Sequence, residues 1–224
     1  MVRDRLTLYS GYLRAIWEVE VIDFLSGVNA RLIIIGGMSR SGKTSLAHEI
    51  ASSLAAFQVL SLDNYLGGKG YQEVVRKPNG FYTIQQEMAL KFNFIKIVSD
   101  VKALLAGRSI HISVYDRARR MPAAKPISMR LKDSERLIVE GTPALAIAQL
   151  ISLPSFKIYL RASIEERKTA LFHDWTTVKK LSIEQAKALF SYRREFEEPF
   201  IHSTRYSADV LLLRNMSNLF IETI

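Results

Sequence analysis

The chain has 224 residues, no cysteine and a formal net charge of +9. The absence of cysteine excludes disulfides and thiolate metal sites and agrees with a reducing compartment. No apolar run is long enough to span a membrane, and the N-terminus lacks the pattern of a signal peptide. We therefore expect a cytoplasmic protein without a membrane partner, built as one domain over 1–224.

The positive charge favours anionic partners. The densest basic cluster, DRARRMPAAK at 116–125, is too short and too poor in aromatic residues to indicate a nucleic-acid-binding face. We therefore do not expect nucleic acid as a partner. Most of the charge is expected on solvated surface, and the remainder is available for phosphate groups.

The first segment, 1–29, has apolar side chains at helical spacing, which predicts an N-terminal helical extension of one helix or a helix pair. We expect this extension to pack on the domain. A contact between two copies of the chain is the alternative, and it would make the protein a homo-oligomer. The residues that carry the pattern are Leu6, Tyr9, Leu13, Ile16 and Trp17, continued by Val21, Phe24 and Leu25.

Beyond this segment, short apolar runs alternate with helical patterns, which predicts an α/β fold whose parallel sheet has helices on both faces. Loops rich in glycine and proline at 66–80 and 121–126 suggest insertions at one rim of the sheet and no domain boundary. Strands are expected at 32–35, 58–62, 110–114, 136–139, 156–160 and 209–213. Helices are expected at 43–55, 85–106, 143–150, 163–174 and 182–198.

The segment GMSRSGKT, residues 37–44, matches the Walker A pattern G-x-x-x-x-G-K-[ST] between a predicted strand and a predicted helix. Its glycines let backbone N–H groups turn toward phosphate oxygens, and the helix N-terminus adds a positive dipole end. Lys43 is placed to reach the β- and γ-phosphates, and the Thr44 hydroxyl to ligate Mg²⁺. The expected nucleotide-binding residues are Gly37, Met38, Ser39, Arg40, Ser41, Gly42, Lys43, Thr44 and Ser45.

Two acidic residues follow predicted strands, where an open α/β sheet places its ligands. LSLDNYL puts Asp63 at the end of the second strand, and RLIVEG puts Glu140 at the end of the fourth. Glu140 stands where a Walker B acid would help to hold Mg²⁺. A GTPase is disfavoured because the chain lacks N-K-x-D and has no D-x-x-G after the fourth strand. The four histidines show no metal-ligand spacing, so the metal implied is Mg²⁺ carried with the nucleotide.

The chain resembles the uridine kinase and phosphoribulokinase superfamily, with pantothenate kinase as a further relative, over about residues 31–214. The resemblance implies a P-loop NTPase-type fold with a small helical lid at about 163–182. Six blocks occur in the family's order: GGMSRSGKT, LSLDNYL, DVKALLAGRSIHISVYD, LIVEGTPAL, KIYLRASIEERK and RREFEEPFIHSTRYSADVLL.

The resemblance also implies roles for single residues. Asp63 corresponds to the base for the acceptor hydroxyl, with a turn or helix-cap residue as the alternative. Lys43 and Arg167 would neutralise the transferring phosphoryl group, and Glu140 would help to organise the metal. Tyr115, in the Y-D pair after the third predicted strand, would wall the nucleoside site, with simple packing as the alternative.

Several departures concern the acceptor. Glu87, within IQQEMALKF, falls opposite the aspartate that grips the ribose hydroxyls in uridine kinases, without the surrounding motif. Arg120 falls opposite a histidine of those enzymes and would suit an acidic or phosphorylated acceptor better than a pyrimidine edge. The alternative for Arg120 is a solvated loop residue. Glu87, Tyr115 and Arg120 are the predicted substrate-binding residues.

The predicted lid is also poor in arginine. Arg167 matches the first lid arginine of the family, but Ala170 and Leu171 stand where two more are usual. Lys179 and Lys180 would substitute as point charges.

The sequence therefore predicts an ATP-dependent, Mg²⁺-dependent small-molecule kinase that transfers the γ-phosphate to a hydroxyl acceptor. The resemblance favours a nucleoside such as uridine, and pantothenate, glycerate or a sugar phosphate remain open. The alternative from another class is a nucleotide-binding regulatory protein with little transferase activity.

Overall fold

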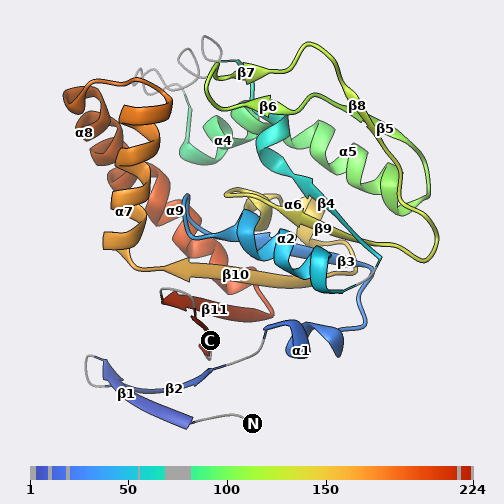
Figure 1. Ribbon diagram of the computed structural model, residues 1–224, viewed down its shortest axis with the longest axis horizontal. Coiled ribbons are helices and arrows are strands. Elements are labelled where there is room, and N and C mark those ends of the chain that lie inside the picture. The colour runs from blue at the N-terminus through green and yellow to red at the C-terminus, as the bar shows by residue number, and fades with distance from the viewer. Residues whose placement is uncertain are drawn as a thin grey trace.

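The computed structural model describes residues 4–9, 12–18, 21–54, 56–68, 82–215 and 218–222. Its centre is a mixed sheet with the strand order β1-β2-β12-β11-β10-β3-β9-β4 (Figure 1). Neighbouring strands from β11 to β4 run parallel, whereas β12, β2 and β1 add to one edge in antiparallel orientation. The parallel strands are β11 (Val210–Asn215), β10 (Phe156–Ala162), β3 (Leu32–Gly36), β9 (Arg136–Glu140) and β4 (Phe57–Ser61).

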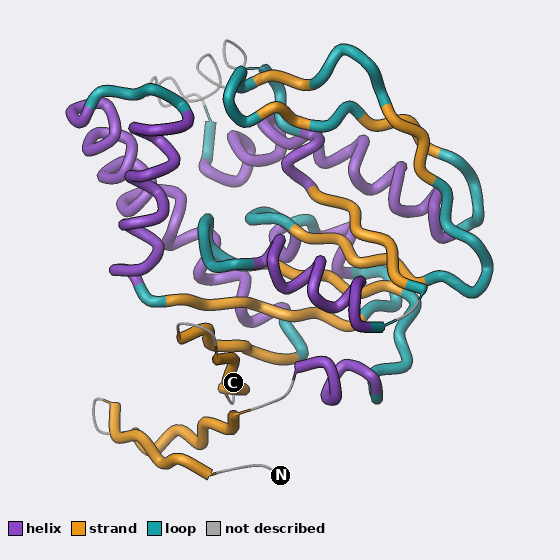
Figure 2. Tube along the Cα trace, in the orientation of Figure 1, coloured by secondary structure: helices purple, strands orange, loops and turns teal. Residues whose placement is uncertain are grey.

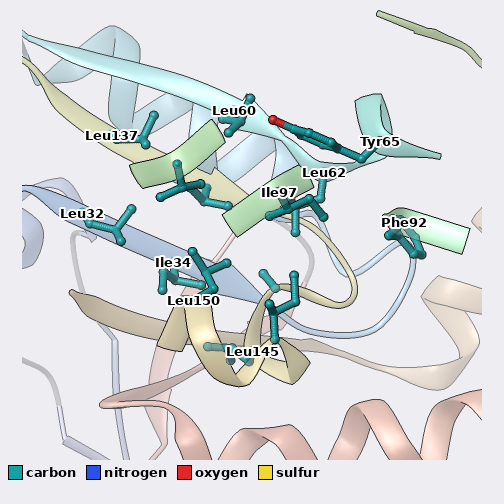
Figure 3. Packing of buried hydrophobic residues seen from close by; sticks show 14 of the residues in the cluster. Leu32, Ile34, Leu60, Leu62, Tyr65, Phe92, Ile97, Leu137, Leu145 and Leu150 are labelled. Atoms are coloured by element: carbon teal, nitrogen blue, oxygen red, sulfur yellow. The ribbon is translucent and has the colours of Figure 1, made fainter. Parts of the chain in front are cut away.

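Helices cover both faces of this sheet because successive apolar residues of a strand point to opposite sides. In β3, Leu32 and Ile34 pack into one hydrophobic cluster and Ile33 and Ile35 into another, and all four are fully buried. Figure 3 shows the first cluster at Leu32 and Ile34. Its helices are α4 (Ile84–Phe92), α5 (Phe94–Leu105), α6 (Ala148–Ile151) and α9 (Glu198–Ser203), and those of the second cluster are α1 (Val21–Ser26) and α2 (Lys43–Ser53). The predicted α/β fold is confirmed.

A helical hairpin stands beside this body (Figure 2). It consists of α7 (Ile164–His173), a π-helical turn (Asp174–Val178) and α8 (Ile183–Tyr192), which a second π-helical turn (Arg193–Glu197) connects to α9. A small separate core of Leu171, Trp175 and Ala186 joins α7 to α8. These helices occupy the region of the predicted lid, and closure over a nucleotide stays a prediction.

The prediction of helix throughout 1–29 is wrong. Residues 4–18 contain β1 (Asp4–Tyr9) and β2 (Tyr12–Glu18), and helix occurs only at α1. Leucine, aromatic and β-branched residues also suit a pleated strand, and only sheet partners decide between the two. β2 pairs with β1 and, at its other edge, with β12 (Asn218–Glu222). The sequence did not predict the strand β12.

The strand expected at 110–114 lies outside the parallel sheet. β5 (Ile110–Ile112) pairs instead with β8 (Ile127–Met129) in a separate antiparallel ribbon. A short apolar run predicts a strand but not its neighbour. Between β5 and β8 the chain forms a second small hairpin from β6 (Tyr115–Asp116) and β7 (Met121–Pro122).

The helix expected at 85–106 is two helices, because Asn93 between α4 and α5 has a left-handed backbone (φ 48°). The helix expected at 143–150 is also divided in the structure, into a 3₁₀ turn (Ala144–Ala146) and α6. Most of the loop expected at 66–80 lies outside the described residues. Among the helices that the structure describes, none is both long and apolar enough to cross a membrane.

Candidate functional site

A cavity of about 540 Å³ lies at the carboxyl ends of β4 and β9, beside the start of α2. Its lining comes from the loop before α2 and the start of that helix, the residues after β4, α4, the β6–β7 hairpin, the end of β9 with the residues after it, and the α7–α8 region. This is the edge at which an open parallel sheet places its ligands. The cavity therefore joins the predicted phosphate loop to the predicted acceptor residues.

Two glycines of the loop have conformations that other residues rarely adopt. Gly37 has φ +134°, and a Cβ there would lie 2.2 Å from the carbonyl oxygen of Leu160. Gly42 has φ +93°, and its Cβ would lie 2.0 Å from Nη1 of Arg214. Arg214 of β11 therefore packs on the loop, a contact that sequence reasoning missed because no motif contains this residue. Gly42 is also the N-cap of α2 and offers no side-chain cap, which leaves the first N–H groups for an anion.

Lys43 is buried at the start of α2, with 6% of its surface exposed. Its Nζ donates to the carbonyl oxygen of Met38 at 2.6 Å. Burial lowers the pKa of Lys43 to about 8, although Glu140 and Asp63 oppose this shift. A phosphate oxygen beside Nζ would compensate the cost of burying this ammonium group.

Thr44 and Glu140 lie together, as a Mg²⁺ site requires. The Thr44 hydroxyl donates to Oε1 of Glu140 at 3.2 Å, and Glu140 is 2% exposed. Hydroxyl and carboxylate oxygens suit Mg²⁺, which usually takes one or two protein ligands and completes its shell with phosphate oxygens and water. The residues present therefore fit a nucleotide-bound Mg²⁺.

Asp63 lies in a 3₁₀ turn (Leu62–Tyr65) directly after β4 and lines the cavity. Its Oδ2 accepts a hydrogen bond from Nη2 of Arg117 at 2.7 Å. The same turn holds the β6–β7 hairpin, because the backbone N–H of Tyr115 donates to Oδ1 of Asn64 at 3.1 Å. Sequence reasoning missed Arg117, and the basic cluster at 116–125 was the only signal for it.

The predicted substrate residues differ in position. Tyr115 and Arg120 line the cavity, and Arg120 has a left-handed backbone (φ 57°). Glu87 is buried on α4, outside the set of described residues that line the cavity. Its carboxylate forms an ion pair with Lys91 and accepts a hydrogen bond from the Tyr192 hydroxyl. Lys91, rather than Glu87, is the lining residue of this group.

The predicted lid arginine, Arg167, is buried and forms an ion pair with Glu198 at 2.6 Å. Burial lowers the pKa of Arg167, although Glu198 opposes the shift. Arg167 is not among the residues that line the cavity, whereas Arg193 is. Arg193 donates through Nη1 to the Ser39 hydroxyl of the loop at 3.1 Å, and its guanidinium lies over the Trp175 ring.

A second contact joins the loop to the α7–α8 region. Asp174 forms ion pairs with Arg40 of the loop and, at 3.0 Å, with Lys179. Burial alone would raise the pKa of Asp174, but the attraction of Lys179 and Arg40 outweighs burial and holds this pKa below its usual range. Lys179, one of the two lysines expected to replace lid arginines, therefore lies at the cavity with its charge paired to Asp174.

Comparisons with known proteins agree with this geometry. Residues 32–219 match the model of the Phosphoribulokinase / Uridine kinase family. A uridine kinase of Lactococcus lactis subsp. cremoris is 26% identical over an alignment of 204 residues, which covers 84% of this chain and 91% of that protein.

Solved structures show the same fold. A putative fructose transport system kinase from Silicibacter sp. TM1040 matches with a TM-score of 0.63 at 18% identity, over 88% of this chain and 100% of that one. A possible uridine kinase from Bacillus stearothermophilus matches with a TM-score of 0.56 at 18% identity, over 85% of this chain and 94% of that one.

Proposed function

The chain belongs to the Phosphoribulokinase / Uridine kinase family, and from this premise we propose that it transfers the γ-phosphate of ATP to a hydroxyl group of a small molecule. One observation carries the proposal. Lys43 of the phosphate loop and Asp63 after β4 line the same cavity, so that a donor and an acceptor can meet between them. Phosphoryl transfer requires positioning and charge neutralisation above all, and this arrangement supplies both.

Each residue on the donor side of the cavity has a proposed role in binding the nucleotide. Backbone N–H groups of 37–45 and the start of α2 hold the phosphates, with Lys43 on the β- and γ-phosphates. Thr44 and Glu140 would hold Mg²⁺, which would supply positive charge that neutralises the phosphates. Arg167 would have to leave Glu198 to reach a phosphate, whereas Arg193 already lines the cavity. We therefore propose Arg193 as a lid arginine that neutralises the phosphoryl group, in addition to the predicted Arg167.

On the acceptor side, Asp63 orients the hydroxyl and takes its proton. The acceptor oxygen forms a bond to the γ-phosphorus, and the bond from that phosphorus to the β–γ bridging oxygen breaks. ADP leaves with the bridging oxygen, and the proton passes from the Asp63 carboxylate to solvent. Tyr115 and Arg120 line the same end, and Glu87 contributes indirectly through its ion pair with the lining residue Lys91.

The acceptor is a nucleoside such as uridine, after which the curated relatives are named, or another small alcohol such as pantothenate, glycerate or a sugar phosphate. The alternative is a nucleotide-binding regulatory protein with little transferase activity. The ion pair between Arg167 and Glu198 favours this alternative, because the predicted lid arginine is buried and is not among the residues that line the cavity.

Acceptor-dependent ADP release tests the proposal. Asp63→Asn is expected to lower kcat by about 10²- to 10⁴-fold, since the base for the acceptor hydroxyl is removed, with a much smaller change in nucleotide affinity. Lys43→Met is expected to weaken nucleotide binding and to lower turnover by about 10³-fold. Asp23→Asn, the same change at an exposed residue of α1, is the control and should alter neither.

Two outcomes would contradict parts of the proposal. Turnover unaffected by Asp63→Asn would remove Asp63 from the role of base. Nucleotide binding without any acceptor-stimulated ADP release would favour the regulatory alternative.

A further inference from the structure

We infer that Tyr192 is a positioning residue: its hydroxyl, bonded to Glu87 of α4, fixes the end of α8 so that Arg193 lies against the phosphate loop. This inference rests on the proposed phosphoryl transfer, in which Arg193 neutralises the transferring group. It adds a residue that is not among those lining the cavity and that acts through its neighbour.

The first contact joins α8 to α4. The Tyr192 hydroxyl donates to Oε2 of Glu87, whose carboxylate also forms an ion pair with Lys91. Glu87 is buried, so its charge has to be met by partners within the protein. A hydrogen bond to an ionised group is also stronger than one between neutral groups. The Tyr192 hydroxyl is therefore anchored to a carboxylate that belongs to the body of the protein.

The second contact joins the same point of the chain to the phosphate loop. Arg193 follows Tyr192 with a helical backbone (φ −66°, ψ −40°), and successive side chains of a helix point about 100° apart. The two side chains therefore diverge. Tyr192 reaches α4, whereas Nη1 of Arg193 donates to the Ser39 hydroxyl at 3.1 Å. The bond to Glu87 thus sets the direction from which Arg193 approaches the loop.

The segment after α8 needs such an anchor because its backbone is irregular. Residues 193–197 form a π-helical turn, a conformation that is rare and occurs frequently at functional sites. A change between π and α bonding in this turn would alter the directions of its side chains. The ring of Tyr192 packs on Phe196, which is 49% exposed and belongs to the same turn. The hydroxyl bond, by contrast, attaches the segment to a different helix.

The position of Arg193 decides its use in catalysis. A guanidinium that is already in place needs no reorganisation when charge develops in the transition state. Its planar fork also matches phosphate oxygens only in a defined geometry. Loss of the Tyr192 hydroxyl should therefore slow phosphoryl transfer. Nucleotide affinity should change less, because Lys43 and the backbone of the phosphate loop still bind the phosphates.

A double-mutant cycle on kcat tests the inference. Tyr192→Phe removes only the hydroxyl and is expected to lower kcat about 10-fold, with a change in KM for ATP of less than about threefold. Arg193→Gln is expected to lower kcat about 100-fold. In the double variant, Tyr192→Phe should have almost no further effect, because the guanidinium that it positions is absent.

The assay measures ADP release with uridine, pantothenate, glycerate or fructose 6-phosphate, whichever stimulates it most. Tyr206→Phe is the matched control, since Tyr206 is 69% exposed, does not line the cavity, and bonds through its hydroxyl to the neighbouring Arg205. We expect it to retain the kcat of the unaltered protein. A purely structural role of Tyr192 would lower kcat by the same factor with and without Arg193.

Trp175 reports the position of Arg193 without any turnover. This tryptophan is fully buried, and the Arg193 guanidinium lies 5.2 Å from the centroid of its ring. Trp17, the other tryptophan of the chain, is unchanged in every variant. Tyr192→Phe and Arg193→Gln should both alter the tryptophan emission, because each removes the charge from its place over the ring. The double variant should match Arg193→Gln.

Failure of the inference is distinguishable from failure of the proposed function. The inference is overturned if Tyr192→Phe leaves kcat unchanged, or lowers it equally in the presence and absence of Arg193. An emission change in Arg193→Gln that Tyr192→Phe does not reproduce would also overturn it. Absence of ADP release with all four acceptors would overturn the proposed phosphoryl transfer, and the emission would then still decide whether Tyr192 positions Arg193.

Discussion

The two ends of the cavity are built in different ways. The phosphate end is built around one continuous stretch, 37–45, whose backbone geometry follows largely from its own glycines and from the helix that begins at Lys43. The acceptor end combines Asp63 after β4, Arg117 from a separate hairpin, and Lys91 from α4.

This difference determines which kinds of substitution each end tolerates. In the phosphate loop, backbone N–H groups supply much of the phosphate binding, so a change of backbone conformation is harmful. At the acceptor end, charged side chains neutralise one another, so removal of one charge weakens the compensation of its partner. Substitutions at the two ends should therefore fail for different reasons.

The largest expected effect is at the acceptor end. Glu87→Gln removes the carboxylate that neutralises Lys91, whose side chain is 4% exposed. Loss of one partner of a buried ion pair costs about 3–5 kcal/mol, so Tm should fall by about 10 °C.

Thermal unfolding of this variant is compared with that of Glu49→Gln, the same change at an exposed position of α2. Equal Tm values would argue against a structural ion pair. An unchanged Tm with a raised acceptor KM would instead support the direct substrate contact that the sequence predicted for Glu87.

At the phosphate end, Gly37→Ala tests the backbone. The added Cβ would meet the Leu160 carbonyl oxygen, which belongs to the central sheet and cannot move aside, and the positive φ adds strain. We expect a loss of about 2–4 kcal/mol in the free energy of unfolding and weaker nucleotide binding.

Denaturant unfolding and nucleotide titration measure these effects. Gly27→Ala is the control, because its Cβ would make only an ordinary contact of 3.6 Å with the Phe24 carbonyl oxygen. A Gly37→Ala variant as stable as this control would show that the loop is not held as described.

The smallest effect concerns the contact between the α7–α8 region and the loop. Asp174→Asn should cost about 1–2 kcal/mol at neutral pH, because the partners Arg40 and Lys179 are themselves part exposed. Tm is expected to fall by a few degrees.

The pH dependence of this loss has a definite sign. The folded protein holds the pKa of Asp174 below its usual range. The stabilisation is therefore fully present above the unfolded pKa of about 3.9 and is lost as the pH falls through the folded value. Unfolding curves of both proteins from pH 7 to pH 3 measure this, and the gap between them should shrink below about pH 4. A gap that is constant over this range would show that folding does not lower the pKa of Asp174.

The sequence alone predicted what local patterns determine. Buried apolar runs gave the positions of β3, β4, β9, β10 and β11, since strands covered on both faces contain few polar residues. The glycines of the phosphate loop are spaced for phosphate binding, and a match of consecutive residues does not depend on the rest of the chain.

Only the tertiary structure decided the contacts between distant residues. The β1–β2 hairpin joins the main sheet because β12, from the other end of the chain, pairs with β2. Arg117 meets Asp63 across 54 residues, and Tyr192 meets Glu87 across 105. Local periodicity contains no information about such partners, because pairing and burial of charge depend on which segments the fold brings together. The sequence thus determined how a phosphate donor would be held, and the fold decided which charges face the acceptor.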